Sequence, residues 1–209
     1  MNGNIQGVSI CAGAPSITHL LFADDSLLLL KANDENAAHL RHVLQIYETC
    51  SGQKINKEKS SIVFIKNTKS CARRRFMEIL DLTREMLNSR YLGLPVYMGR
   101  SKKSVFAYLK ERVWKRIKGW KEKLLSKAGK ETLIKAVAQS IPSYAMSCFD
   151  LTKSLCDEMS GMIRRYWWAQ QDKENKMHWV SWEEMCRRKE EGGIGYRDLH
   201  LFNLAMLAR

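Results

Sequence analysis

The stretch Leu20–Leu30, with the sequence LLFADDSLLLL, places two adjacent aspartates between two apolar runs. Apolar runs on either side of a short polar segment predict two buried strands joined by a tight hairpin, with Asp24 and Asp25 at its tip. Two neighbouring carboxylates repel each other unless a cation or solvent compensates them. The pattern therefore predicts either a solvated turn or part of a ligand set for a hard divalent cation.

Further helices and strands are predicted in the first half of the chain. Residues 34–50 are predicted to form a helix that Asp34 caps and that ends before Gly52. Residues 60–65 (SSIVFI) predict a short buried strand, and residues 71–80 a short basic helix. The segment 91–97 is aromatic and broken by glycine and proline, which predicts a bent hairpin.

After Gly99 the period of the apolar residues changes from that of strands to that of helices. Apolar side chains recur every three or four residues in three sets, which predicts a small bundle of amphipathic helices. The sets are Val105, Leu109, Val113, Ile117, Trp120 and Leu124; Leu133, Ile134, Val137 and Ile141; and Leu155, Met159, Met162, Ile163 and Tyr166. The fold class is therefore α+β, with strands and helices first and a helical part second.

Several sequence strings occur in one order along the chain and together carry a family resemblance. They are Ile17–Ser26, Ser51–Asn56 with Lys59, Tyr91–Pro95, Gly119–Lys121, Leu125–Lys130, Ile141–Met146 and Gly192–Tyr196. In this order they resemble the reverse transcriptase of plant LINE-type (non-LTR) retrotransposons over nearly the whole chain. The resemblance implies the C-terminal half of a polymerase palm in residues 1–98, a helical thumb in 99–170, and a connecting segment in 171–209.

The resemblance implies RNA-directed DNA synthesis on an RNA template and DNA primer, with deoxynucleoside triphosphates as substrates. Asp24 and Asp25 would be ligands in a site for two magnesium ions, with Asp24 as the firmer ligand. Lys59 would lie near the triphosphate, and an ordinary surface lysine is the equally weighted alternative. Tyr91 and Gly93 would belong to the hairpin that holds the primer end, the alternative being a packed aromatic residue and a turn glycine.

The catalytic set implied by the resemblance is incomplete in this chain. Residues 1–23 contain no Asp or Glu, whereas the family's third carboxylate and its fingers region precede the hairpin. We therefore expect a C-terminal fragment without polymerase activity of its own. Two alternatives stay open: a non-catalytic nucleic-acid-binding module, and the translated relic of a decayed mobile element.

Positive charge is concentrated in one segment of the chain. The formal net charge is +13, and residues 100–135 contain thirteen Lys or Arg against three Glu. Such a balance favours phosphate contacts with nucleic acid. About 6 to 10 contacts would reduce affinity roughly 10³- to 10⁵-fold between about 50 and 200 mM salt. The expected contact residues are Lys102, Lys103, Lys110, Arg112, Lys115, Arg116, Lys118, Lys121, Lys123, Lys127 and Lys130.

Composition excludes several other classes of protein. No apolar run approaches the roughly 18 to 20 residues of a membrane span, and no secretory signal is visible. The six cysteines lack the Cys-x-x-Cys spacing of zinc sites. Trp114 and Trp120 follow helical spacing and are predicted to be core residues rather than base-stacking ones. These features indicate an intracellular protein and leave nucleus and cytoplasm equally open.

Overall fold

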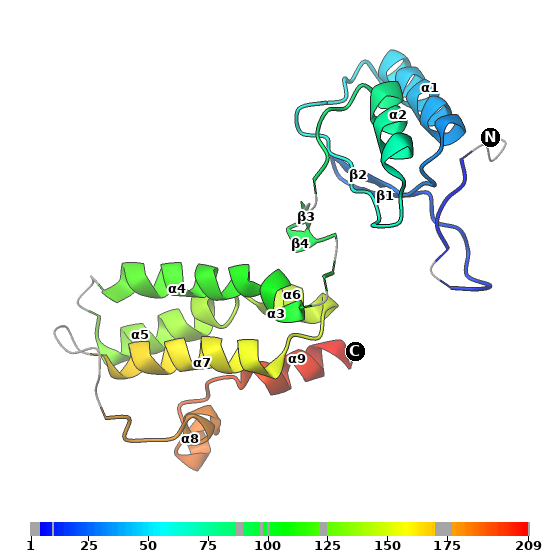
Figure 1. The fold of residues 1–209 in the computed structure, drawn as a ribbon. Coiled ribbons are helices and arrows are strands. Elements are labelled where there is room, and N and C mark those ends of the chain that lie inside the picture. The colour runs from blue at the N-terminus through cyan, green and yellow to red at the C-terminus, as the bar shows by residue number, and fades with distance from the viewer. Residues whose placement is uncertain are drawn as a thin grey trace. The chain divides into compact units, whose positions relative to one another are not determined.

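The computed structural model describes residues 5–9, 11–86, 90–96, 98–99, 101–121, 125–169 and 177–208. The chain divides into two compact units, Met1–Tyr97 and Met98–Arg209. Figure 1 shows that the first unit combines strands with two helices, whereas the second is helical. Within the described ranges, no helix is long and apolar enough to cross a membrane.

The aspartate hairpin is present, but its strands are exposed. Strands β1 (His19–Phe22) and β2 (Asp25–Leu28) pair antiparallel with Phe22 opposite Asp25, which leaves Ala23 and Asp24 as a two-residue turn. Leu21 and Phe22 are 67% and 60% exposed. The prediction of buried strands is therefore wrong, because this sheet has two strands only and the helices of the unit pack chiefly on each other.

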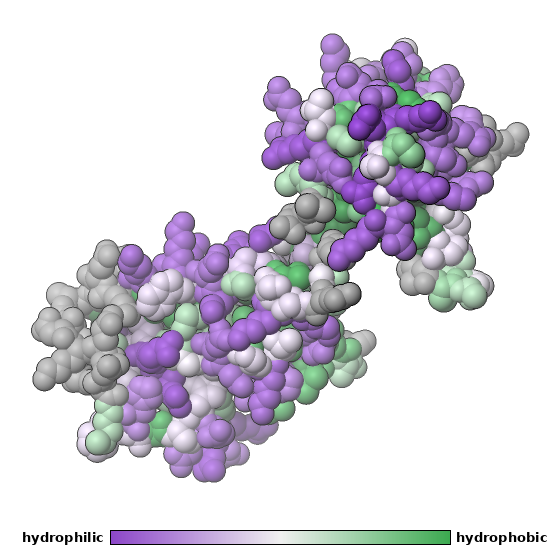
Figure 2. Space-filling model, viewed as in Figure 1, coloured by the Kyte–Doolittle hydropathy of each residue, from purple (hydrophilic) through white to green (hydrophobic). Residues whose placement is uncertain are grey.

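Helices α1 (Asp34–Ser51) and α2 (Ser70–Leu80) lie where the sequence predicts helices. The cap of α1 is Asn33 and not Asp34, because the Asn33 side chain accepts the backbone N–H of Asn36. Gly52 ends the helix in the left-handed conformation that glycine adopts without steric cost. Figure 2 shows apolar patches that interrupt the hydrophilic surface, and the α1 residues Val43 and Tyr47 are about half exposed.

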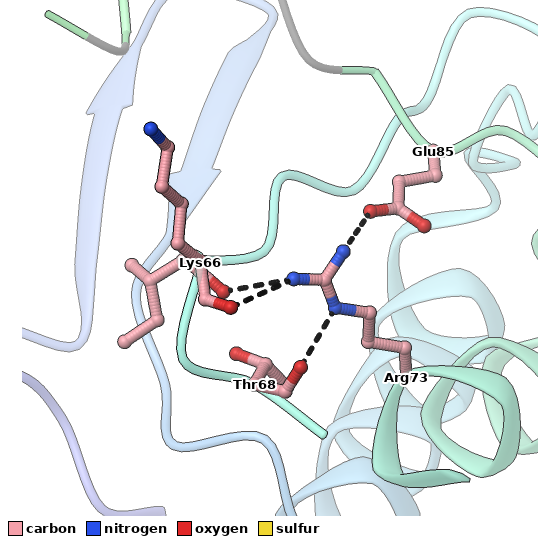
Figure 3. A network of polar contacts seen from close by, with 5 residues as sticks. Lys66, Thr68, Arg73 and Glu85 are labelled. Atoms are coloured by element: carbon pink, nitrogen blue, oxygen red, sulfur yellow. Dashed lines mark hydrogen bonds and ion pairs between the residues drawn. The ribbon is translucent and has the colours of Figure 1, made fainter. Parts of the chain in front are cut away.

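The segment 60–69 is held by a polar network instead of a strand ladder. Ile62 makes one isolated bridge with Glu85, so the predicted strand over 60–65 is wrong. The Arg73 guanidinium donates to the carbonyls of Thr68 (3.0 Å) and Ile65 (3.1 Å) and pairs with Glu85 at 3.0 Å (Figure 3). Because a guanidinium presents five donors in a fixed fork, this one side chain ties the loop to α2.

A second, smaller hairpin follows. Strands β3 (Arg90–Tyr91) and β4 (Leu94–Pro95) pair antiparallel around the turn Leu92-Gly93. Both turn residues have positive φ, 52° and 79°, which is the conformation that matches the twist of a two-residue hairpin. The predicted bent hairpin is thus confirmed over residues 90–95, while Tyr97 lies outside the described residues.

The second unit is built on the packing of α4 (Ala107–Lys121) against α7 (Lys153–Trp168). The buried side chains at this contact are Leu109, Val113 and Ile117 of α4, Phe106 just before it, and Leu155, Met159 and Ile163 of α7. The third predicted apolar set thus lies in a single helix. The first set spans two helices, with Leu124 outside the described residues, and the middle set is divided among shorter elements. The elements are α3 (Lys102–Val105), α4 (Ala107–Lys121), α5 (Lys127–Leu133), the π-helix η1 (Ile134–Ala138), α6 (Ser143–Cys148), α7 (Lys153–Trp168), α8 (Trp182–Cys186), the 3-10 helix η2 (Lys189–Glu191) and α9 (Leu199–Leu207).

We expect Arg73→Lys to loosen the first unit without affecting the second. A lysine keeps the charge but loses the fork, and the carbonyls of residues 65 and 68 then lack their donor, at a cost of about 1–3 kcal/mol. Hydrogen exchange over residues 60–86 should accelerate. Tryptophan fluorescence should melt unchanged, because all six tryptophans lie beyond residue 98. Arg74→Lys is the matched control, since Arg74 is exposed and has no partner in the described chain. Equal exchange in both variants contradicts the role of Arg73.

Candidate functional site

The aspartate pair is presented to solvent at the hairpin tip. Asp24 occupies the turn, and Asp25 is the first residue of β2. Both residues are exposed, and neither carboxylate has a hydrogen bond or ion pair with the described residues. Ala23 adopts a φ of 48° to close the turn. Both carboxylates are therefore free to accept an external cation or to remain solvated.

The small hairpin contacts the aspartate hairpin. The Tyr91 hydroxyl donates to the carbonyl of Leu20 in β1 at 3.4 Å. This bond links β3 to the strand that leads into Asp24. Gly93 has open space around the position of a Cβ, and its φ of 79° alone explains the glycine. A hydrogen bond therefore explains Tyr91, and a turn conformation explains Gly93, without any ligand. The contact of this hairpin with a primer stays a prediction.

Lys59 extends from a turn that follows α1. Its backbone N–H donates to the Asn56 side chain at 3.0 Å, and the Ser60 N–H closes the turn on the Asn56 carbonyl. The Glu48 carboxylate accepts the Ile55 N–H at 2.8 Å. The string Ser51–Asn56 is therefore a helix cap and a turn. Lys59 itself is exposed, with no side-chain partner in the described chain.

Metal ligands are few in the described part of the chain. No group of three or more His, Cys, Asp or Glu side chains gathers there in a way that could hold an ion. Magnesium is often bound by one or two carboxylates, with substrate phosphates and water completing its six ligands. Asp24 and Asp25 match that requirement in type and number, while a third protein carboxylate is lacking among the described residues.

The predicted nucleic-acid-binding residues separate into two groups, and the first group stabilises the bundle. Lys102 pairs with Asp150 at 3.3 Å, and both Lys103 and Lys110 pair with Glu158 of α7. Lys127 and Lys130 donate to the carbonyls of Trp167 and Ala169 at the end of α7. Burial, together with the charge of Lys127, lowers the pKa of Lys130. These lysines neutralise acids or cap a helix end, which reduces the charge they offer to an external anion.

The second group is the set of exposed cations of α4, which we call the α4 outer face. Arg112, Lys115, Arg116 and Lys118 are exposed and have no partner in the described chain. Their spacing of three and four residues puts the first three on adjoining turns. The side chain of Lys121 and the whole of Lys123 lie outside the described residues. Four cations without partners therefore replace the larger set that the sequence predicts.

One of the two sequence predictions about tryptophan is wrong. Trp114 is 44% exposed on α4, because helical spacing places it just outside the buried arc of that helix. Trp120 packs on Tyr166 with ring centroids 5.7 Å apart, as predicted for a core residue.

The sequence did not predict that Tyr196 and Lys135 join Trp167 and Trp182 in one cluster of the second unit. The Tyr196 ring contacts Trp167 and Trp182 with centroids 5.7 Å from each. The Lys135 ammonium lies 5.8 Å from the same ring and donates to the Ile194 carbonyl at 2.5 Å. The string Gly192–Tyr196 is thus a turn docked on η1, as its glycines at positive φ allow. The only available signal was the sequence GGIGY beside aromatic residues.

Comparison with known proteins finds similarity to plant sequences. It is 37% identical over 116 residues to the Arabidopsis thaliana protein named "Putative ribonuclease H protein At1g65750", covering 56% of this chain and 19% of the relative. It is 44% identical over 71 residues to the "Uncharacterized mitochondrial protein AtMg00310" of the same plant, covering 34% of this chain and 46% of the relative. No family model matches.

The matched segments thus span less than half the length of either relative. The matches agree with the coarse part of the resemblance, a plant protein related to mobile elements. Neither name specifies a reverse transcriptase.

We expect the Glu158 ion pairs to support the bundle in a pH-dependent manner. Hydrogen bonds from Lys103 and Lys110 lower the pKa of Glu158 from 4.5 to about 2. The stabilisation is therefore complete above about pH 4.5 and disappears as the pH falls toward 2. Glu158→Gln should lower the melting temperature at neutral pH, and the difference from wild type should vanish in acid.

Asp157→Asn is the matched control for this experiment, because Asp157 lies on the same helix, is exposed and makes no ion pair with the described residues. Tryptophan fluorescence follows the unfolding of the second unit in both variants. A constant difference between wild type and Glu158→Gln across the acid range contradicts the assignment.

Proposed function

We propose that this chain is a nucleic-acid-binding part of a LINE-type reverse transcriptase. Two features support the proposal: an exposed aspartate pair without partners at a hairpin tip, and an exposed basic helix face without partners. The α4 outer face carries the argument, because four cations on one rigid helix suit the regular phosphates of a duplex. The related plant proteins support a mobile-element origin at a coarser level.

In the proposed reaction a primer 3′-hydroxyl attacks the α-phosphate of a deoxynucleoside triphosphate and pyrophosphate leaves. Asp24 and Asp25 would hold divalent magnesium, which when bound supplies charge neutralisation at the phosphates. Lys59 would pair with a phosphate oxygen of the triphosphate. The hairpin of Tyr91 and Gly93 would position the primer, since it is already bonded to β1.

A non-catalytic binding module is the second candidate, and one observation favours it. The described residues contain no group of three acidic or metal-binding side chains, whereas two-metal phosphoryl transfer uses carboxylates that clamp both ions. Binding through α4 needs no such group. We therefore propose that the chain binds duplexes by itself, and that polymerisation requires a carboxylate from outside the described residues.

Charge reversal on α4 tests the binding proposal. Arg112→Glu with Arg116→Glu should weaken binding of a fluorescein-labelled RNA–DNA hybrid at least about tenfold and reduce the salt slope by about 2. Four phosphate contacts in the wild type correspond to a slope of about −3.6, or roughly a 150-fold loss between about 50 and 200 mM salt.

The matched control for this test is the double variant Lys69→Glu with Arg74→Glu. It changes the net charge equally, at exposed positions of the first unit. Fluorescence anisotropy measures both variants, and circular dichroism checks that each is folded. Equal weakening by the control would show that only net charge matters, and the assignment to α4 would then be abandoned.

Manganese binding tests the aspartate pair. Mn²⁺ takes the same oxygen ligands as Mg²⁺ and is detected by its electron paramagnetic resonance signal. We expect weak binding by the wild type, a clear loss in Asp24→Asn with Asp25→Asn, and no change in Asp157→Asn. If the double variant binds Mn²⁺ as well as wild type does, the pair is a solvated turn and the second candidate function is preferred.

A further inference from the structure

Gly119 is a glycine for which the described residues show no structural need. It lies inside α4, two residues before the helix ends at Lys121, and it is exposed. A Cβ added there meets no heavy atom of the described chain within 4 Å, and its φ is not positive. Glycine within a helix is unfavourable relative to alanine because it gives up more backbone freedom. Among the described residues, neither packing nor backbone conformation compensates that cost.

Three of the other glycines in the second unit, Gly192, Gly193 and Gly195, have a structural reason. Gly192 and Gly195 have φ values of 82° and 74°, which side chains rarely adopt. A Cβ on Gly193 would clash with the backbone of Arg187. Gly161 in α7 resembles Gly119, since it is helical and a Cβ there also meets open space. It lies on a different helix from the α4 outer face and so provides a comparison.

The position of Gly119 connects it to the α4 outer face. It follows Arg112, Lys115 and Arg116 by seven, four and three residues, so all four lie on one side of the helix. The missing side chain leaves open space beside this row of cations. Glycine is the residue that permits a ligand to approach a backbone closely.

We propose that Gly119 is a positioning residue at which the sugar–phosphate backbone of a duplex comes into contact with the backbone of α4. The cations of the outer face draw in the phosphates, and the open space at Gly119 determines how closely the strand lies against the helix. This inference rests on the proposed nucleic-acid binding and adds to it a steric requirement. Any side chain at residue 119 then weakens binding, including one that carries positive charge.

Substitution by alanine separates this requirement from stability. Gly119→Ala and Gly161→Ala should each raise the melting temperature followed by tryptophan fluorescence by roughly 2–4 °C, because each removes a helical glycine. Only Gly119→Ala should weaken binding of the labelled RNA–DNA hybrid, by about threefold or more. A variant that is more stable and yet binds less well cannot be explained by partial unfolding.

Substitution by lysine separates the steric requirement from charge. Coulomb attraction alone predicts tighter binding by Gly119→Lys, since a cation is added to a basic face. Close approach predicts weaker binding, by about tenfold, because the lysine stem fills the open space. Tighter binding, or affinities unchanged in both Gly119 variants, overturns the inference.

The failure of this inference is distinguishable from failure of the proposed function. Wild type that does not bind the hybrid refutes both. A second outcome refutes only the role of Gly119. In that case the wild type binds the hybrid, charge reversal of Arg112 and Arg116 weakens binding, and alanine or lysine at residue 119 does not.

Discussion

The burial of one face of α4 against α7 determines how charge is distributed over the second unit. Leu109, Val113 and Ile117 are almost completely buried, and their spacing sets the rotation of α4 about its axis. Lysines at the border of this contact reach α7, where Glu158 accepts two of them. Exposed cations of α4, such as Arg112 and Arg116, make no ion pair with the described residues. One apolar contact thus decides which cations stabilise the fold and which remain available to an anionic partner.

The first unit depends on a different kind of interaction. Among its described residues only Ala37, Leu40 and Phe76 are buried apolar side chains. Hydrogen bonds hold together segments that a larger core would otherwise hold. Arg73 bonds the loop before α2, and Tyr91 links the two hairpins. Such bonds are directional, so they set the position of the aspartate turn without burying its strands. Exposed Leu21 and Phe22 leave apolar surface next to that turn, a feature typical of surfaces that contact further protein.

Local sequence patterns predicted the positions of helices and turns better than they predicted which side chains are buried. The helices 34–51 and 153–168 follow from apolar periodicity, and the turns at Asp24 and Gly93 follow from strand breaks and a glycine. Burial did not follow, because the period of a strand says which residues share a face and not whether anything covers it. The network around Arg73 joins residues far apart in sequence, so no local pattern reveals it. For the candidate site, charge density predicted a basic helix, but only the partners on α7 show which of its lysines are already engaged.

The two features that support a reverse transcriptase are structurally independent. The aspartate turn is determined by the β1–β2 register and by Tyr91, all within residues 1–97, and the α4 outer face is determined by helix packing within residues 98–209. Phosphate binding by four cations requires no metal, and cation binding by two carboxylates requires no helix. Under the proposed function, loss of catalytic capacity in the first unit would therefore leave duplex binding by the second intact. Because the same fold would serve a polymerase and a binding module, the difference between them lies in whether a third carboxylate joins Asp24 and Asp25, not in the helical unit.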